Sequence, residues 1–283
     1  MNSKKIIAIT GASSGIGFEV TEQLAYLGHT IIMIGKSEAK LMAAQKLIKD
    51  KTGNSSISIF TTDLSIQQQV RILAEQIHKQ FDKLDVLINN AGAVYAKFET
   101  TEDGYERTIA TNHFNYFLLT HLLLDLLNRS EQGRIINVAS DSHFSGKIDV
   151  ESFIKKKNYF ILSAYAQSKL ANVLFTYELA ERLKGTSITV NALHPGRVRT
   201  KIGNKNQPWY FSVPWSLVML WHSVSTNTAA KTYIYLATND GLRYITGKYF
   251  DNCKVKPSSK LSYNKELQQL LWQTSERYCS IKY

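Results

Sequence analysis

Short apolar runs alternate with longer amphipathic stretches along the first two thirds of the chain. Six of the short runs are rich in Ile and Val and mostly do not alternate apolar with polar residues, which predicts strands buried on both faces. These runs are residues 6–10, 30–34, 57–61, 84–88, 134–138 and 188–193, with a seventh candidate at Tyr249 and Phe250. Apolar residues at helical spacing predict helices over 15–27, 38–51, 66–81, 102–127, 164–183 and 226–238.

This order of strands and helices is typical of repeated βαβ units. Such units build a parallel sheet with helices on both faces. No linker rich in Pro, Gly or Ser divides the 283 residues, and the sequence shows no internal repeat. We therefore predict one α/β domain over residues 1–283, with a doubly wound parallel sheet of about seven strands.

The chain is basic, with 34 Lys and Arg against 23 Asp and Glu and a net charge of +11. A nucleic-acid-binding protein would be expected to gather these charges in a stripe interleaved with aromatic residues. Here the densest basic run is only 155–157. We interpret the excess charge as a solvated surface that also favours a polyanionic cofactor, and we predict no nucleic-acid partner.

The cysteines and the N-terminal residues bear on the compartment. Cys253 and Cys279 have no His or Cys neighbours at ligand spacing, so we predict neither a disulfide framework nor a metal site. From Met1 the sequence enters an apolar strand pattern and reaches glycine too early for a signal peptide. No stretch approaches 18 uncharged apolar residues, so we expect a cytoplasmic protein without a transmembrane segment.

A glycine-rich loop, T-G-A-S-S-G-I-G, occupies residues 10–17 between the first predicted strand and the first predicted helix. Glycine lets the backbone turn sharply and approach a pyrophosphate, whose charge is stabilised at a helix N-terminus. Three residues separate the first two glycines, so the loop departs from the G-x-G-x-x-G pattern of most dinucleotide-binding proteins. Taken alone, an ordinary strand-to-helix turn is the alternative interpretation.

Further short motifs follow the later predicted strands, at the edge where parallel sheets bind ligands. The motifs are 89–92 (N-N-A-G), 137–140 (N-V-A-S), 165–169 (Y-A-Q-S-K) and 194–196 (H-P-G). Asn112 lies between the first two motifs, within the predicted helix 102–127.

Together and in this order, the loop and the motifs resemble the short-chain dehydrogenase/reductase family over roughly residues 5–250. The 25 residues from Ser140 to Tyr165, and several other stretches, are similar to the retinol dehydrogenase-like branch of that family. Those stretches are 103–106, 112–114, 117–120, 168–172 and 194–196. The resemblance implies a Rossmann fold, an oxidoreductase and a homo-oligomer, since family members are commonly dimers or tetramers. Members of the branch often carry an N-terminal membrane anchor, which we do not expect here.

The resemblance implies catalytic roles for Asn112, Ser140, Tyr165 and Lys169. Tyr165 would be the acid/base, and Lys169, one helical turn away, would lower its pKa electrostatically and bond the nicotinamide ribose. Ser140 would orient the substrate oxygen, and Asn112 would hold a water that links Lys169 to solvent. The cofactor-binding residues implied are Gly11, Ser13, Ser14, Gly15, Ile16, Gly17, Lys36, Asp63, Leu64, Asn90, Ala91, Gly92, Tyr165, Lys169, Pro195, Gly196 and Val198.

Two histidines lie beside these residues in the sequence. His143 comes three residues after Ser140, where it could line the pocket, and His113 directly follows Asn112. Because a loop histidine is more often solvated, we expect both at the surface and assign neither a role.

The end of the second predicted strand bears on cofactor choice. In NAD-binding relatives an acidic residue there bonds the ribose 2′-hydroxyl, whereas this chain has Lys36 and Ser37. Both could hold a 2′-phosphate. The alternative is that Lys36 is only a solvated residue at the start of a helix. We predict NADP(H) as the preferred cofactor and NAD(H) as the second choice.

Residues 197–225 follow the sixth predicted strand and are dense in large apolar groups, among them Trp209, Phe211 and Trp215. We predict a lid over a small but bulky hydrophobic carbonyl or alcohol, of the retinal, steroid or lipid-aldehyde kind. Core packing, a dimer surface and peripheral membrane contact are the alternatives for this segment. The alternative is a catalytically inactive protein on the same scaffold, with a binding or regulatory function either at a membrane or away from one.

Overall fold

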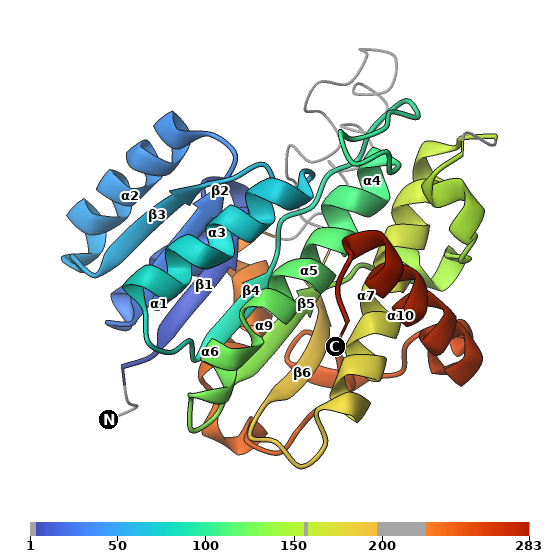
Figure 1. The fold of residues 1–283 in the computed structure, drawn as a ribbon. Coiled ribbons are helices and arrows are strands. Elements are labelled where there is room, and N and C mark those ends of the chain that lie inside the picture. The colour runs from blue at the N-terminus through green and yellow to red at the C-terminus, as the bar shows by residue number, and fades with distance from the viewer. Residues whose placement is uncertain (1–3, 156–157, 197–224, 283) are drawn as a thin grey trace.

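The computed structural model describes residues 4–155, 158–196 and 225–282. An eight-stranded sheet runs through its centre in the order β3-β2-β1-β4-β5-β6-β7-β8 (Figure 1). The first seven strands are parallel, and the last pairs antiparallel with its neighbour. The strands are β1 Ile6–Thr10, β2 Thr30–Gly35, β3 Ile57–Thr61, β4 Val86–Asn89, β5 Arg134–Val138, β6 Thr189–His194, β7 Lys248–Asp251 and β8 Lys254–Lys256.

The doubly wound parallel sheet is confirmed, and β8 is an addition to it. Asn252 and Cys253, which join β7 to β8, have φ values of +48° and +60°. Two successive residues with positive φ form the type of two-residue turn that matches the twist of a hairpin. The chain therefore reverses after β7 and adds one short antiparallel strand at the edge of the sheet.

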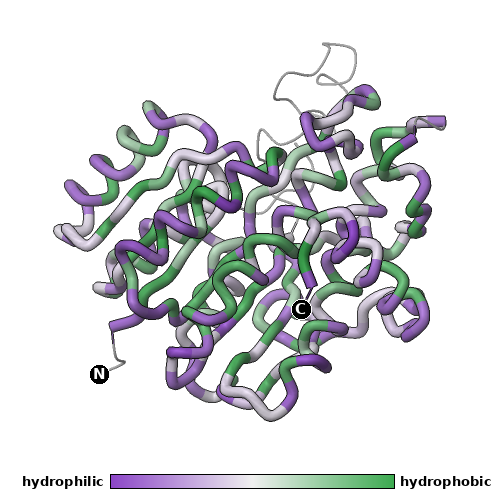
Figure 2. Tube along the Cα trace, viewed as in Figure 1, coloured by the Kyte–Doolittle hydropathy of each residue, from purple (hydrophilic) through white to green (hydrophobic). Residues whose placement is uncertain are grey.

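Helices cover both faces of the sheet (Figure 1). On one face lie α1 Gly15–Tyr26, α2 Glu38–Thr52 and α9 Thr226–Thr238. On the other lie α3 Gln67–Gln80, α5 Asn115–Leu122 and α7 Ile161–Arg182, with α10 Lys265–Cys279 packed against α7 and α5. Hydrophobic positions follow the central strands and hydrophilic ones the outer sides of the helices (Figure 2). The apolar strands are thus buried from both sides, as their lack of alternation predicts.

The region predicted as a single helix over 102–127 is broken, so that prediction is wrong. It contains α4 Arg107–Ile109, the π-helical turn η1 Ala110–Phe114, α5 and α6 Leu124–Asn128. A π turn holds one more residue than an α turn and shifts the backbone hydrogen bonds. The apolar pattern gave no sign of this shift, because α5 is buried on nearly every side from Asn115 to Thr120.

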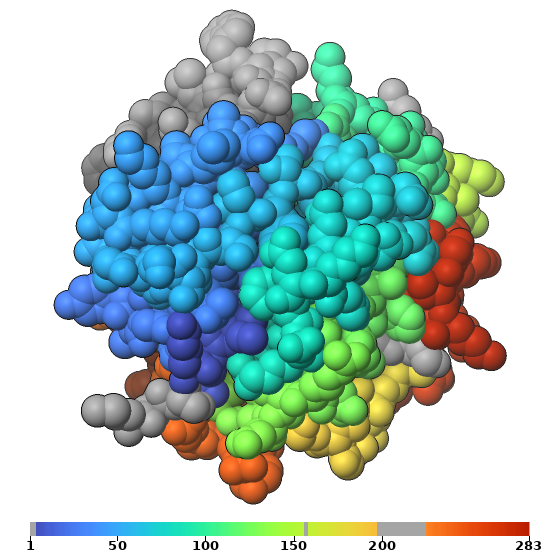
Figure 3. Space-filling model, turned by 60° about the vertical axis from the view of Figure 1, so that its left-hand side comes forward, coloured from blue at the N-terminus to red at the C-terminus, as the bar shows by residue number. Residues whose placement is uncertain are grey.

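Several shorter elements and α10 were not predicted. The short ones are 3₁₀ helices: η2 Asp141–Ser145, η3 Val150–Phe153, η5 Asp240–Leu242 and η6 Lys260–Tyr263. In the space-filling view the N-terminal elements (blue) and the C-terminal segment (red) lie on opposite sides of the surface (Figure 3). None of the helices in the described ranges is long and apolar enough to cross a membrane.

Candidate active site

The glycine-rich loop leads from the carboxyl end of β1 into α1. Gly11 and Gly15 adopt left-handed backbone conformations with φ of +69° and +60°, which favour glycine. A Cβ atom on Gly17 would lie 2.3 Å from the Gly11 carbonyl oxygen and 2.7 Å from Asn90 Nδ2. The loop and the 89–92 turn are therefore in direct contact, and only glycine fits at position 17.

The N-terminus of α1 has the properties of an anion-binding site. Its N-cap residue, Ser14, is extended and makes no side-chain capping hydrogen bond, and the first turn holds no acidic residue. The first N–H groups of a helix lack partners within the helix and carry a partial positive charge. Ser13 lies just before this helix end, and Ile16 lies in its first turn. The predicted loop residues therefore surround one helix end, and this arrangement fits a pyrophosphate.

Thr10 fixes the N-N-A-G element to the end of β1. Its hydroxyl oxygen accepts hydrogen bonds from the backbone N–H groups of Asn90 and Ala91, both at 2.9 Å. Asn90 Nδ2 donates to the Thr10 carbonyl at 2.8 Å, and the Tyr233 hydroxyl on α9 donates to Asn90 Oδ1 at 3.1 Å. Gly92 follows directly, so this turn has a fixed place beside the glycine-rich loop.

The structure pairs two residues predicted to contact the cofactor. Lys36, at the end of β2, forms an ion pair with Asp63, which follows β3; the two side chains are 65% and 18% exposed. Burial alone would raise the pKa of Asp63, but hydrogen bonds from Lys36 and Ser65 outweigh it and lower that pKa. Leu64 is buried beside them. The ammonium of Lys36 thus lies at the carboxyl ends of the parallel strands, along which a dinucleotide would bind. No acidic residue stands at the end of β2.

Tyr165 and Lys169 lie one turn apart on α7. Lys169 is only 2% exposed, and its Nζ is 5.7 Å from the centroid of the Tyr165 ring. The Nζ donates to the Val138 carbonyl at 2.9 Å, and Asn172 Nδ2 donates to the same oxygen at 3.2 Å. The carboxyl end of β5 therefore holds the lysine in place.

Ser140 follows β5, where its hydroxyl oxygen accepts from Ser142 N at 3.2 Å, and its side chain lies close enough to Tyr165 to lower the pKa of the phenol. Burial raises the pKa of Tyr165 to about 12, and the effect of Ser140 offsets only part of that rise. Burial also lowers the pKa of Lys169 to about 7. The direction for Tyr165 is opposite to the lowering expected from Lys169, because burial dominates and a lysine that is half neutral near pH 7 exerts less electrostatic effect.

Asn112 lies in the η1 turn, where both hydrogens of its side-chain amide are donated in hydrogen bonds. Its Oδ1 accepts from the Ala93 N–H at 2.8 Å, and its Nδ2 donates to the Ala93 carbonyl at 2.9 Å and to Ser168 Oγ at 3.0 Å. Ser168 in turn donates to the Tyr165 carbonyl at 2.8 Å. The four predicted catalytic residues are thus joined around the first half of α7. A water at Asn112 would have to donate a hydrogen bond to Oδ1, because both amide hydrogens are already donated to other groups.

The predicted residues after β6 are only partly described. Pro195 and Gly196 follow the strand directly, and Gly196 has a φ of +81°. Val198 and the predicted lid lie outside the described residues up to position 224. Ser225 is the N-cap of α9 and accepts from Thr228 N. The lid therefore stays a prediction.

Both histidines expected at the surface are fully buried, so that expectation is wrong. His143 Nδ1 lies 2.6 Å from the Ser140 carbonyl, and the Ser259 N–H donates to its Nε2 at 3.1 Å. His113 Nε2 lies 2.9 Å from Ser275 Oγ. In each case residues more than a hundred positions away cover the ring, which no local pattern indicates.

Sequence reasoning also missed Tyr116. Its ring is fully buried, with the centroid 5.9 Å from Lys169 Nζ. Its hydroxyl is buried, with no hydrogen-bond partner in the described part of the chain, and burial raises its pKa well above the usual value. The spacing of four residues from Asn112 was the available signal, because it places both side chains on one helical face.

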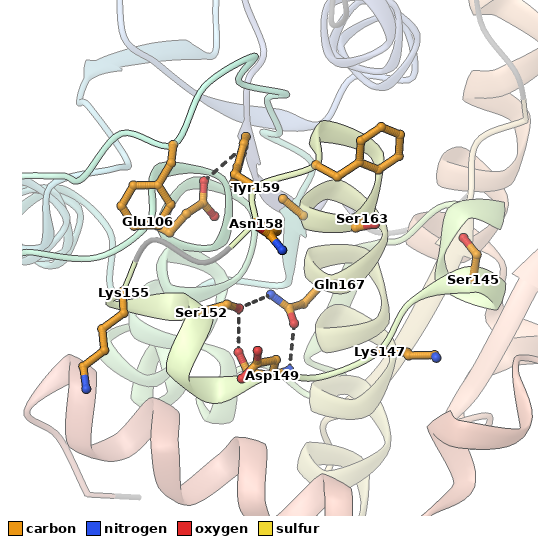
Figure 4. A pocket seen from close by; sticks show the side chains of 13 residues that line it. Glu106, Ser145, Lys147, Asp149, Ser152, Lys155, Asn158, Tyr159, Ser163 and Gln167 are labelled. Atoms are coloured by element: carbon orange, nitrogen blue, oxygen red, sulfur yellow. Dashed lines mark hydrogen bonds between the residues drawn. The ribbon is translucent and has the colours of Figure 1, made fainter.

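A pocket of about 370 Å³ lies beside the N-terminal end of α7 (Figure 4). Glu106 and Tyr159 line one side, and Gln167 bonds to the Asp149 N–H and to Ser152 (Figure 4). Glu106 is committed to capping α4, where it accepts from two backbone N–H groups. None of the four predicted catalytic residues lines this pocket. Within the described ranges, no group of three or more His, Cys, Asp or Glu could hold a metal ion.

Comparisons with known proteins agree with this geometry. A family model described as short chain dehydrogenase matches residues 5–210. Human retinol dehydrogenase 13 is 39% identical over 282 residues, which cover 98% of this chain and 85% of that protein. A crystal structure of an uncharacterized protein from Mycobacterium paratuberculosis has a TM-score of 0.79 at 28% identity, covering 99% of this chain and 95% of its own. A short chain dehydrogenase from Shigella flexneri, complexed with NADP, has a TM-score of 0.68 at 25% identity, with coverages of 90% and 98%.

Proposed function

Because the chain belongs to the short-chain dehydrogenase/reductase family, in its retinol dehydrogenase-like branch, and is an oxidoreductase of alcohol or carbonyl groups, we propose that it transfers a hydride between NADP(H) and a bulky hydrophobic carbonyl or alcohol. The observation that carries this proposal is the grouping of Tyr165 and Ser140 around the buried Lys169, whose Nζ lies 5.7 Å from the centroid of the Tyr165 ring. It joins a proton donor, an orienting hydroxyl and an ammonium at the edge of the sheet where the glycine-rich loop lies.

The residues at the cofactor end fit a phosphorylated dinucleotide. The glycines at 11 and 17, with the N-terminus of α1, would hold the pyrophosphate, because their backbone leaves space that a Cβ would fill. Lys36 and Ser37 would hold the 2′-phosphate in place of the acid found in NAD-binding relatives. The family uses NAD(H) or NADP(H), and the NADP complex of the Shigella flexneri relative supports the phosphorylated form. When bound, the reduced nicotinamide supplies the hydride.

At the catalytic end, the side chains handle the proton. With a pKa raised to about 12, the Tyr165 hydroxyl is protonated at neutral pH and can donate its proton to the oxygen of a carbonyl that gains a hydride. The Ser140 hydroxyl would donate a second hydrogen bond to the same oxygen and orient it. Lys169 would stabilise the phenolate that remains, and a water at Asn112 would return the proton from solvent.

The substrate class rests on the retinol dehydrogenase relatives and on the sequence of residues 197–225. The name of the human relative points to a long apolar alcohol or aldehyde, and the aromatic residues of 197–225 suit a lid over such a molecule. We propose a cytoplasmic homo-oligomer in which this segment closes over the substrate and contacts a membrane surface at most peripherally. Both cysteines are free in the described part of the chain, which agrees with a reducing compartment.

The test is oxidation of NADPH by the purified protein over a panel of carbonyls. The panel would hold retinal, a steroid ketone, a long-chain aldehyde and a short aldehyde, each also offered with NADH. We expect turnover with the bulky apolar compounds, faster with NADPH than with NADH. A protein that binds NADPH but turns over none of these compounds would contradict the proposal and support an inactive scaffold.

A further inference from the structure

His113 is fully buried in the same π-helical turn as Asn112. Burial lowers its pKa to about 4, so the imidazole is neutral at physiological pH. Its ring packs edge-on against Phe175 of α7, with the centroids 6.0 Å apart, and is tilted against Phe117 of α5 at 6.4 Å. A polar ring enclosed in this way is costly unless it finds hydrogen-bonding partners.

One partner comes from α10. His113 Nε2 lies 2.9 Å from Ser275 Oγ, although 162 residues separate the two in sequence. Four residues further along α10, the Cys279 thiol contacts the carbonyl of Phe114, the last residue of the η1 turn, at 3.8 Å. The helix α10 therefore holds the turn at two points.

The end of α10 is itself fixed to the rest of the domain. The Tyr278 carbonyl accepts hydrogen bonds from Gln67 Nε2 at 2.9 Å and from the Tyr105 hydroxyl at 3.0 Å. Arg71 on α3 donates to the Cys279 carbonyl at 2.5 Å. These donors satisfy carbonyls that the last turn of a helix leaves without partners. As a result, α10 is a fixed support for the groups it contacts.

His113 also borders α7, the helix that carries Lys169, through its contact with Phe175. Its Nδ1 and the Oδ1 of Asn172, one turn beyond Lys169, are both buried without a hydrogen-bond partner in the described part of the chain, and the two side chains are close enough for Asn172 to oppose the effect of burial on the pKa of the imidazole. Asn172 Nδ2 and Lys169 Nζ donate to the same acceptor, the Val138 carbonyl. His113 thus lies between the support provided by α10 and the hydrogen bond that places Lys169.

We propose that His113 is a positioning residue: by joining the turn that carries Asn112 to Ser275 of α10, and by packing beside the Asn172 that shares an acceptor with Lys169, it holds the proton-relay groups in register with Tyr165. This inference rests on the proposed function. His113 touches neither substrate nor cofactor, and its effect passes through its neighbours. Small displacements of catalytic groups are known to lower rates strongly even when the substitution lies away from the reacting atoms.

The test compares three variants in steady-state reduction with NADPH. His113→Leu removes the contact with Ser275 and the polar edge near Asn172 at similar volume, Ser275→Ala removes the partner on α10 together with its bond to the Leu271 carbonyl, and His113→Gln keeps an amide that can reach Ser275. We expect His113→Leu and Ser275→Ala to lower kcat on the order of tenfold with little change in KM. His113→Gln should recover most of the lost kcat.

A double variant tests the connection directly. If His113 and Ser275 act through one contact, the double variant His113→Leu with Ser275→Ala will be no slower than His113→Leu alone. Effects that multiply would show two independent losses and would overturn the coupling. The matched control is Thr274→Ala, which removes a buried hydroxyl one position earlier on α10 and should leave kcat unchanged.

The outcomes separate this inference from the proposed function. An active wild type whose folded His113→Leu and Ser275→Ala variants keep full kcat overturns the positioning role alone. An equal loss in Thr274→Ala also overturns it, because general loosening of α10 would then explain the effect. A wild type inert toward every carbonyl contradicts the proposed function itself. If His113→Leu does not fold, Ser275→Ala and His113→Gln decide the question by the same criteria.

Discussion

The two ends of the candidate site differ in which parts of the chain present the chemistry. At the proposed cofactor end, backbone groups of residues 11–17 would form the contact surface, and the Lys36 side chain is 65% exposed. At the proposed catalytic end, Lys169 is 2% exposed and Tyr165 lies beside Ser140. Substitutions at the first end alter a screened charge or a shape, whereas those at the second disturb buried groups that depend on one another.

This difference decides where the chain tolerates change. An exposed ion pair such as that between Lys36 and Asp63 contributes about 0–1 kcal/mol, because water and salt screen it. A buried charge without its partners costs several kcal/mol. Cofactor preference should therefore shift gradually with surface charge, and catalysis should be lost in single large steps.

The largest expected effect is at the catalytic end. Tyr165→Phe removes the proton donor, and general acid catalysis of this kind is worth about 10²–10⁴ in rate, so kcat should fall by that factor. NADPH affinity, measured by fluorescence titration, should stay nearly unchanged. The matched control is Tyr177→Phe, which removes a hydroxyl from the same helix where it bonds Ser258. Wild-type turnover in Tyr165→Phe would disprove the catalytic assignment.

At the cofactor end, the strongest change is one of shape. Gly17→Ala places a methyl group 2.3 Å from the Gly11 carbonyl oxygen, so the loop must move. Overpacking of this kind costs about 1–3 kcal/mol, and we expect NADPH affinity to fall at least about tenfold. Gly53→Asn is the control, because nothing lies within 4 Å of a Cβ there. Unchanged affinity in Gly17→Ala would place the pyrophosphate elsewhere.

A charge change at the same end should have a smaller effect. Lys36→Asp removes the ammonium and adds a carboxylate next to Asp63, which repels a 2′-phosphate. Since exposed charges contribute about 1 kcal/mol or less, we expect the preference for NADPH over NADH, as a ratio of kcat/KM, to fall by about fivefold at most. The control is Lys40→Asp, which makes the same change of charge within the first turn of α2. Equal ratios in both variants would show that another residue binds the phosphate.

The last effect concerns stability and not activity, and it has a definite sign. The pKa of Lys169 is about 7 in the folded chain and about 10.4 when unfolded. Between these values the unfolded chain binds the extra proton, so Lys169 contributes stability that rises with pH. Lys169→Met should therefore unfold at a higher temperature than wild type at pH 7. Each kcal/mol relieved raises Tm by roughly 2–4 °C.

The difference between Lys169→Met and wild type should shrink as the pH rises toward 10. Thermal unfolding without cofactor at a series of pH values measures it. Lys231→Met, at an exposed position on α9, is the control and should show no such trend. A constant difference across the series would mean that Lys169 is not strongly perturbed in the folded chain.

Much of the fold could be predicted because its elements are marked locally. The predicted strand 134–138 and the predicted helix 226–238 match β5 and α9 at both ends, since buried strands and amphipathic helices carry their period in the sequence. Hydrophobic period says nothing about a single inserted residue, so the η1 turn was invisible. The helix α10 did carry a signal, an Asn264 N-cap that accepts from Leu267 N, which was overlooked.

For the candidate site, the order of the motifs in the sequence identified the residues. It did not indicate how deeply they are buried or which residues surround them. The motifs singled out Ser140 and Tyr165, and the structure brings them close enough for Ser140 to affect the pKa of Tyr165. The direction of the Tyr165 pKa could not be predicted, because burial depends on every element packed around the ring. The same holds for His113 and His143, whose partners Ser275 and Ser259 are distant in sequence.

The short strand β8 has a consequence for how copies of this protein meet. It forms one outer edge of the sheet, and its residues Lys254, Val255 and Lys256 are all exposed. An open edge is a template on which another chain can extend the sheet, and lysines there oppose such growth. A second molecule that approached this edge would bring its own lysines against them. β8 therefore protects the protein against aggregation, and an ordered assembly would have to form through surfaces other than this edge.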